Sequence, residues 1–153
     1  MERVMVTFVG DQKNFGSAVK SLIELEYDAS SAYQISIEKI YNKDFKNKLT
    51  EFKHDHERHV KELLELIEKH GEEAPKEADT KEWLTKGKVV LGSLIGDEAI
   101  LRAMNSNEID TNTAYERMCL REDAWKDSIK LLKSFLQDER KHKLWLEETI
   151  KLA

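Results

Sequence analysis

Leu136-Gln-Asp-Glu-Arg-Lys-His-Lys-Leu-Trp-Leu146 contains the two residues on which the interpretation of the whole chain depends. Glu139 and His142 lie three residues apart, so on a helix their side chains share one face. That face is otherwise apolar and consists of Leu132, Phe135, Leu146 and Ile150. A carboxylate or an imidazole on a buried face is costly unless it is paired or binds a metal. The stretch therefore predicts a buried helix face whose two polar groups need partners from other helices.

The composition favours one helical domain that works without nucleic acid or membrane partners. The chain has 153 residues with 6 Gly, 1 Pro and 36% charged residues, which suits long helices better than a sheet. Its net charge is −5 and it contains no basic block, which argues against nucleic acid and acidic membranes as partners. Cys119 is the single cysteine, so an intramolecular disulfide is excluded and a reducing compartment is expected. No apolar run is long enough for a signal peptide or a membrane span, and we expect a cytoplasmic protein.

Apolar residues recur at spacings of three and four over four long stretches, which is typical of amphipathic helices. We expect a first helix that begins between residues 11 and 17 and ends near Tyr41, and further helices over 45–70, 97–118 and 123–151, with Asp44 as the N-cap of the second. A loop with the single proline and a short helix over 80–94 connect the second helix to the third. The sequence therefore predicts an all-α fold, a four-helix bundle with a short extra helix in the crossover between the second and third helices.

The second helix contains several ligand-type residues in close succession, and periodicity sorts them. The apolar row Leu49, Phe52, Leu63 and Ile67 continues through His56 and His59. The literal Glu-x-x-His pair, Glu51 and His54, falls on the opposite, polar row, and Asp55 lies at the edge. We therefore expect His56 and His59 to be buried, and Glu51 and His54 to be exposed.

The first and third helices share a pattern in which one carboxylate interrupts the buried row and a tyrosine follows it seven residues later. The carboxylates are Glu26 and Glu108; 33 residues separate Glu26 from His59, and 34 separate Glu108 from His142. The two halves of the chain thus look like one helical hairpin used twice. Pairing the hairpins about a two-fold axis would bring six groups to one level of the core: Glu26, His56, His59, Glu108, Glu139 and His142.

This pattern resembles the ferritin-like superfamily, the rubrerythrins, bacterioferritins and their bacterial four-helix relatives, over roughly residues 14 to 151. The resemblance implies a single ferritin-like domain over 1–153, with 1–13 as an N-terminal arm. It also implies a di-iron carboxylate site with a Glu from each of two helices and a Glu-x-x-His from each of the other two. Glu26 and Glu108 match the two single carboxylates, and Glu139 with His142 matches the last Glu-x-x-His.

One departure from the family pattern concerns His56, which stands where the family has a Glu that bridges both metals. A neutral imidazole gives one ligand to one metal and does not bridge as a carboxylate does. Glu139 is then the one bridging carboxylate, and less negative charge lies between two dications. We therefore expect two iron positions of unequal occupancy. The stronger is held by Glu108, Glu139 and His142, and the weaker draws on Glu26, His56 and His59.

The expected function is iron handling or oxidative-stress defence through reaction of the metal pair with dioxygen or peroxide. Manganese or zinc in place of iron, a non-catalytic metal-binding protein, and a metal-free structural bundle stay open as alternatives. Whether the chain is an enzyme, a di-iron oxidase or peroxidase, is open as well. Tyr33 and Tyr115 either hydrogen-bond the ligand carboxylates or only pack against them.

We also predict a homodimer, because an apolar arm over 4–9 and three tryptophans are more apolar surface than a small helical domain needs. Sedimentation velocity at micromolar concentration should give a particle of twice the chain mass. A single species at the mass of one chain would contradict this expectation.

Overall fold

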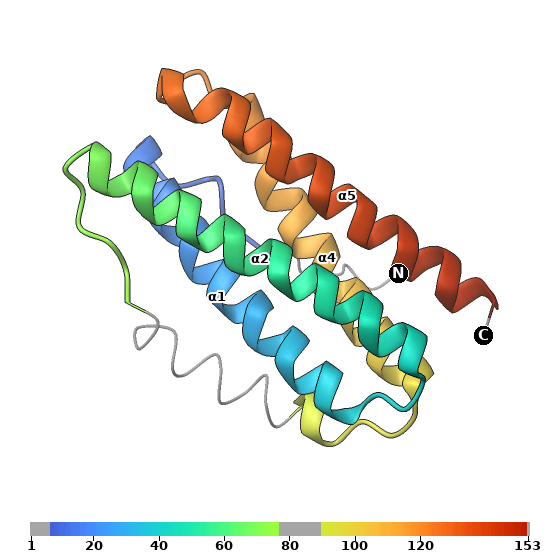
Figure 1. The fold of residues 1–153 in the computed structure, drawn as a ribbon. Coiled ribbons are helices and arrows are strands. Elements are labelled where there is room, and N and C mark those ends of the chain that lie inside the picture. Colours follow the sequence, from blue (N-terminus) through green and yellow to red (C-terminus); the bar gives the residue numbers. More distant parts are fainter. Residues whose placement is uncertain (1–6, 77–89, 153) are drawn as a thin grey trace.

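The computed structural model describes residues 7–76 and 90–152, and these ranges contain helices and no strand. The elements are α1 (Phe15–Lys39), α2 (Lys43–Lys69), α4 (Asp97–Leu120), the 3-10 turn η2 (Lys126–Ser128) and α5 (Ile129–Leu152) (Figure 1). The predicted all-α class is therefore confirmed for the described part of the chain. Most of the short helix predicted over 80–94 lies outside the described residues, although Val90, Leu91 and Gly92 are helical.

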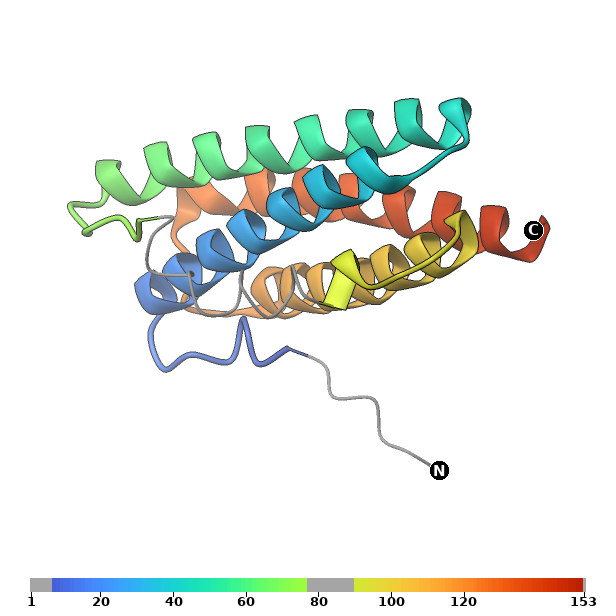
Figure 2. The same ribbon diagram turned by 90° about the horizontal axis from the view of Figure 1, so that it is seen from below.

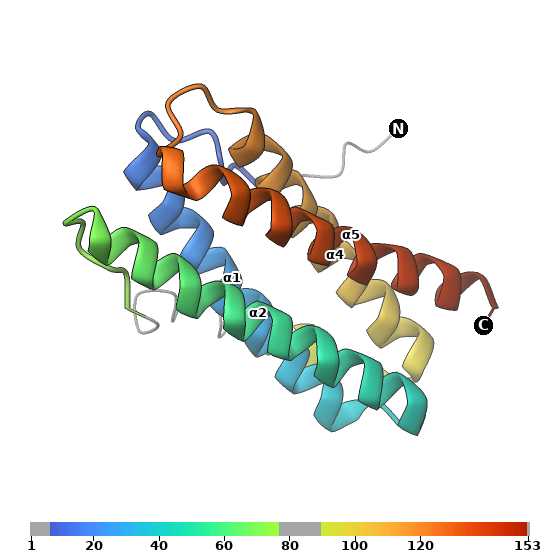
Figure 3. The ribbon, with the colours of Figure 1, turned by 45° about the horizontal axis from the view of Figure 1, so that its top comes forward.

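The long helices form two antiparallel hairpins that lie side by side. A short turn joins α1 to α2, and α4 leads through η2 into α5 (Figure 3). The hairpins meet where α1 packs on α4 and α2 approaches α5, as the view from below also shows (Figure 2). Every long helix thus turns one side towards the other three, and the centre of the molecule receives side chains from all of them.

Side-chain caps fix where α1 and α2 begin. The Asn14 side chain accepts a hydrogen bond from the backbone N–H of Ser17, which satisfies a donor at the start of α1. Asn42, and not the expected Asp44, caps α2, because its side-chain oxygen accepts from the backbone N–H groups of both Asp44 and Phe45. Gly71, with φ +70°, ends α2 in the left-handed conformation that glycine adopts without strain.

The last helix begins later than the sequence predicts. We expected a start near Asp123, but α5 begins at Ile129 after the 3-10 turn η2. The Asp123 carboxylate is held by the Arg121 guanidinium, with two contacts of 2.8 Å, instead of capping a helix. The Ser128 hydroxyl and backbone N–H both donate to the carbonyl of Trp125, which closes the 3-10 turn.

Residues 7–13 form the described part of the N-terminal arm, and two arginines of α4 and its C-terminal end hold it. Arg121 donates to the carbonyls of Gly10 and Gln12 at 2.7 Å each, and Arg117 donates to the carbonyl of Val9 at 3.3 Å. Gly10 has φ +101°, and a Cβ there would lie 2.7 Å from the Cβ of Arg117. The arm therefore packs on α4 at a place where only glycine fits.

The buried apolar side chains form two clusters, one towards each end of the helices. The first includes Phe15, Leu22, Leu63, Met118 and Phe135, and the second includes Tyr33, Leu49, Phe52, Met104 and Leu146. On each long helix, the candidate polar residues lie between positions of the first cluster and positions of the second. The polar level is therefore closed by apolar packing at both ends. Among the described residues, no helix is long and apolar enough to cross a membrane.

Replacement of a cluster residue tests how far the apolar packing holds the hairpins together. Leu63 is fully buried in α2, so Leu63→Ala should lower the free energy of unfolding by about 2–5 kcal/mol. The matched control is Leu144→Ala in α5, where the side chain is 55% exposed and the loss should stay within about 0.5 kcal/mol. Urea denaturation of both variants measures the difference, and equal losses would contradict the burial described here.

Candidate metal centre

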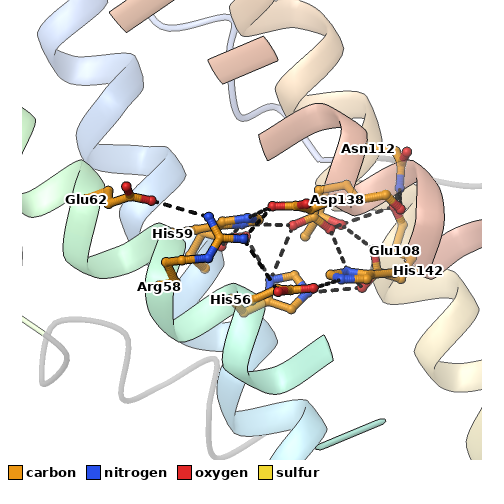
Figure 4. Close-up of polar contacts among 12 residues, drawn as sticks. His56, Arg58, His59, Glu62, Glu108, Asn112, Asp138 and His142 are labelled. Atoms are coloured by element: carbon orange, nitrogen blue, oxygen red, sulfur yellow. Dashed lines mark hydrogen bonds and ion pairs between the residues drawn. The ribbon is translucent and has the colours of Figure 1, made fainter. Parts of the chain in front are cut away.

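The structure brings the six residues singled out from the sequence to one level of the core. Each is at most 1% exposed, and every long helix contributes at least one of them. They are Glu26 of α1, His56 and His59 of α2, Glu108 of α4, and Glu139 and His142 of α5. Figure 4 labels His56, His59, Glu108 and His142. Glu51 and His54 are exposed, so the predicted register of α2 is confirmed.

The six residues form two overlapping sets in which one ligand atom from each residue lies within 4.8 Å of the others. The first ligand group is Glu26, His56, His59 and Glu139. The second ligand group is His56, Glu108, Glu139 and His142. His56 and Glu139 belong to both groups, so they lie at the boundary between two candidate ion positions.

In the first ligand group, Glu26 connects both histidines of α2. Its Oε1 lies 3.0 Å from Nδ1 of His56, and its Oε2 lies 3.0 Å from Nδ1 of His59. Oε1 of Glu139 lies 3.4 Å from Nδ1 of His56 and 3.3 Å from Nδ1 of His59. Two imidazole nitrogens and two carboxylates therefore surround one small volume.

In the second ligand group, Glu108 takes the place that Glu26 has in the first. Its Oε1 lies 3.0 Å from Nε2 of His56 and 3.3 Å from Nδ1 of His142. Oε2 of Glu139 lies 3.6 Å from Nδ1 of His142. Thr111 donates to Oε2 of Glu139 at 2.8 Å, which fixes this carboxylate between the two groups. The second group therefore offers the same kinds of donor as the first.

Two aspartates that the sequence analysis did not assign to the site orient the outer histidines. His59 presents Nε2 to Asp138 at 2.8 Å, and His142 presents Nε2 to Asp55 at 2.7 Å. Each aspartate belongs to the opposite hairpin, so the two contacts link α2 to α5 in both directions. A carboxylate on the outer nitrogen fixes the ring and turns Nδ1 inwards. The sequence signal that could have identified these aspartates is the pattern Asp-x-x-x-His, which occurs at residues 55–59 and again at 138–142.

The two tyrosines differ in role. Tyr33 donates a hydrogen bond to Oε1 of Glu108, as expected of a tyrosine that orients a candidate ligand carboxylate. Burial and the neighbouring Glu108 carboxylate raise the Tyr33 pKa well above its ordinary value, so its hydroxyl keeps the proton. The Tyr115 hydroxyl finds no hydrogen-bond partner among the described residues, and the ring packs edge-on against Phe135 and His59. Tyr115 therefore follows the packing alternative.

Without metal, protons balance the charge of the site. Burial alone would lower the pKa of His59 and His142, but the surrounding carboxylates outweigh it and raise these pKa values to about 11 and about 12. The pKa of His56 is raised well above its ordinary value, since the Glu139 and Glu26 carboxylates outweigh its burial. Protonated imidazoles thus offset negative charge of the surrounding carboxylates, as buried charges require.

The donor atoms are compatible with a metal site. Oε1 of Glu139 and Nδ1 of His142 are buried and lie near other site atoms, but neither makes a hydrogen bond of suitable geometry among the described residues. A buried polar atom without a partner is rare and calls for an explanation such as an unseen ion. Mixed carboxylate and imidazole donors suit iron, manganese and zinc. The arrangement is therefore chemically competent to bind metal in both ligand groups.

Residues 14–120 match the model of a family described as a domain of unknown function, DUF2383. This range contains α1, α2 and α4 with four of the six candidate ligands, and it ends before Glu139 and His142. Searches of curated proteins and of solved structures found no match.

The raised histidine pKa values predict how the stability of the metal-free protein depends on pH. A histidine with a folded-state pKa near 11 and an unfolded value near 6.5 binds more protons in the folded state between these values. Its contribution is complete below pH 6.5 and is lost as the pH rises towards 11. As the pH rises through this window, the contribution of each such histidine to the free energy of unfolding should fall by about 1.4 kcal/mol per pH unit.

Urea denaturation of chelator-treated protein at pH 7, 8 and 9 measures this slope. His59→Gln retains a hydrogen-bonding side chain but cannot be protonated. The slope of its unfolding free energy against pH should therefore be shallower than that of the wild type by about 1.4 kcal/mol per pH unit, the effect of one proton. Identical slopes would show that His59 is neutral in the folded metal-free protein.

Proposed function

This chain belongs to the DUF2383 family, and we propose that its long helices form a ferritin-like four-helix bundle that binds two metal ions in its core. The observation that carries the proposal is the pair of overlapping ligand groups, fully buried and built from all the long helices of the described chain. Each group combines carboxylate and imidazole donors, which is the donor chemistry of ferritin-like metal sites. One ion would occupy each group.

Iron is the metal that the ferritin-like resemblance implies, with dioxygen or peroxide as the second reactant. When bound, a reduced pair of ions supplies electrons to the oxidant. The protein would hold the ligand side chains in position and exclude water from the site. Asp55 and Asp138 hold the outer histidines with Nδ1 inwards, and Tyr33 donates to Glu108. The two apolar clusters close the site at both ends and keep bulk water from it.

A second candidate is reversible, non-catalytic metal binding for storage, buffering or sensing. The observation that favours it is that each site histidine contacts carboxylates that raise its pKa, so protons offset negative charge in the site. The buried carboxylates of such a core would have positive partners with or without metal, because metal ions displace the protons of the ligands when they bind. A protein that must load and release metal needs a stable metal-free state.

Metal stoichiometry tests the proposal directly. Protein purified without a histidine tag and loaded anaerobically with ferrous iron should bind two ions per chain in native mass spectrometry. Glu139→Ala removes a carboxylate that belongs to both ligand groups and should abolish paired occupancy. The matched control is Glu51→Ala on the exposed face of α2, which should bind as the wild type does. A wild type that binds no ion would identify a metal-free structural bundle.

Oxidation of the loaded iron separates the catalytic candidate from the non-catalytic one. Exposure to dioxygen or peroxide should convert the bound ferrous iron to ferric iron faster than free ferrous iron in the same buffer, as followed by absorbance. A protein that binds two ions but leaves the oxidation rate unchanged is the storage or sensing protein of the second candidate.

A further inference from the structure

We propose that His56 is itself a bridging ligand, with Nδ1 bound to the ion of the first ligand group and Nε2 bound to the ion of the second. This inference rests on the proposed function, since it assumes that two ions bind in the two groups. It assigns to the imidazole ring the position between the ions that a carboxylate would otherwise occupy. It also replaces the sequence-based view of His56 as a ligand to one metal only.

The two ring nitrogens of His56 face different ligand groups. Nδ1 lies 3.0 Å from Oε1 of Glu26 and 3.4 Å from Oε1 of Glu139, both in the first group. Nε2 lies 3.0 Å from Oε1 of Glu108, which belongs only to the second group. The ring is fully buried, so neither nitrogen reaches solvent. Both nitrogens therefore point at candidate ligand atoms, on opposite sides of one ring (Figure 4).

The other two site histidines provide an internal comparison. Each of them directs Nε2 away from the site to an aspartate, Asp138 for His59 and Asp55 for His142. They can therefore give the site one nitrogen each. Within residues 7–76 and 90–152, His56 faces no such outer carboxylate, because Nδ1 contacts Glu26 and Nε2 contacts Glu108, both in the site. Among the three site histidines, His56 is thus the one placed to bind two ions.

Packing holds the His56 ring in this orientation. The Tyr33 ring lies 5.1 Å from it at 32°, and the His142 ring lies 5.2 Å from it at 46°, measured between ring centroids. Tyr33 is anchored in turn by its hydrogen bond to Glu108. A ring turned out of this position would lose the contacts of both nitrogens at once. The bridging orientation is therefore already present in the described structure.

The bridge makes the two ion positions equivalent in donors. Each ion would receive two imidazole nitrogens, one carboxylate from α1 or α4, and one oxygen of Glu139. Both ring protons of His56 leave to solvent as the two ions bind, so the bridge is an imidazolate with one negative charge. That charge lies between two cations and offsets their repulsion, as the absent carboxylate would have done.

The bridge also sets the distance between the ions. Two metal–nitrogen bonds of about 2.0–2.1 Å on opposite sides of an imidazole ring place the ions roughly 6 Å apart. Two-metal sites in enzymes commonly hold their ions about 3.5–4 Å apart. Two imidazole nitrogens per ion suit metals that bind imidazole well, which include iron and zinc. The metal–metal distance is therefore the quantity that tests the inference.

Anomalous diffraction from crystals of the zinc-loaded protein measures this distance. The wild type should show two zinc peaks roughly 6 Å apart, one beside each nitrogen of His56. His56→Glu replaces the ring with a carboxylate and should bring the peaks to about 3.5–4 Å. His54→Glu makes the same change on the exposed face of α2 and should leave the wild-type separation unchanged.

The outcomes separate this inference from the function on which it rests. Two zinc ions about 3.5–4 Å apart in the wild type would overturn the bridge while supporting the two-ion site. A single strongly occupied peak would also overturn it, and would favour the unequal positions expected from the sequence. Absence of any bound zinc, together with no iron in the loading experiment, would overturn both the bridge and the proposed function. The wild-type measurement decides the inference even if His56→Glu does not fold.

Discussion

Six ionisable side chains in the centre of a small helical protein must neutralise one another, and the rest of the structure depends on this constraint. An unpaired buried charge costs several kcal/mol, a large fraction of the stability of a domain of this size. The structure meets the constraint by alternating carboxylates and imidazoles, so that Glu26 contacts both histidines of α2 and Glu108 contacts His56 and His142. No single helix can do this, which is why all the long helices must meet at this level.

The apolar packing is arranged around that polar level. Two clusters of buried side chains lie on either side of it, so every long helix changes from apolar to polar and back to apolar along its buried face. The clusters supply the hydrophobic stabilisation and exclude water, while the polar level specifies how the hairpins align. A shift of α2 against α5 by one helical turn would separate Asp55 from His142 and Asp138 from His59 together. The polar contacts therefore select one register among the apolar packings.

Protons on the histidines and the metal ions of the proposed function would perform the same electrostatic task. Both would place positive charge between carboxylates that could not otherwise be buried together. An imidazole at position 56 suits this task, because each ring nitrogen can carry a proton, whereas a carboxylate there would add negative charge to the site.

The sequence by itself determined the helices and the faces they bury. A period of 3.6 residues separates the buried His56 and His59 from the exposed Glu51 and His54, because it depends only on the geometry of one helix. The sequence was less reliable at helix ends, because capping depends on short-range contacts that have no period. Asn42 caps α2 in place of the predicted Asp44, and α5 begins only after the 3-10 turn η2.

Only the tertiary structure decided which atoms meet across the helices. That Asp55 contacts His142, and that the two nitrogens of His56 face different carboxylates, follows from the alignment of the hairpins and from ring orientation. These contacts join residues that lie 30, 52 and 87 positions apart in the sequence. Periodicity within one helix contains no information about either.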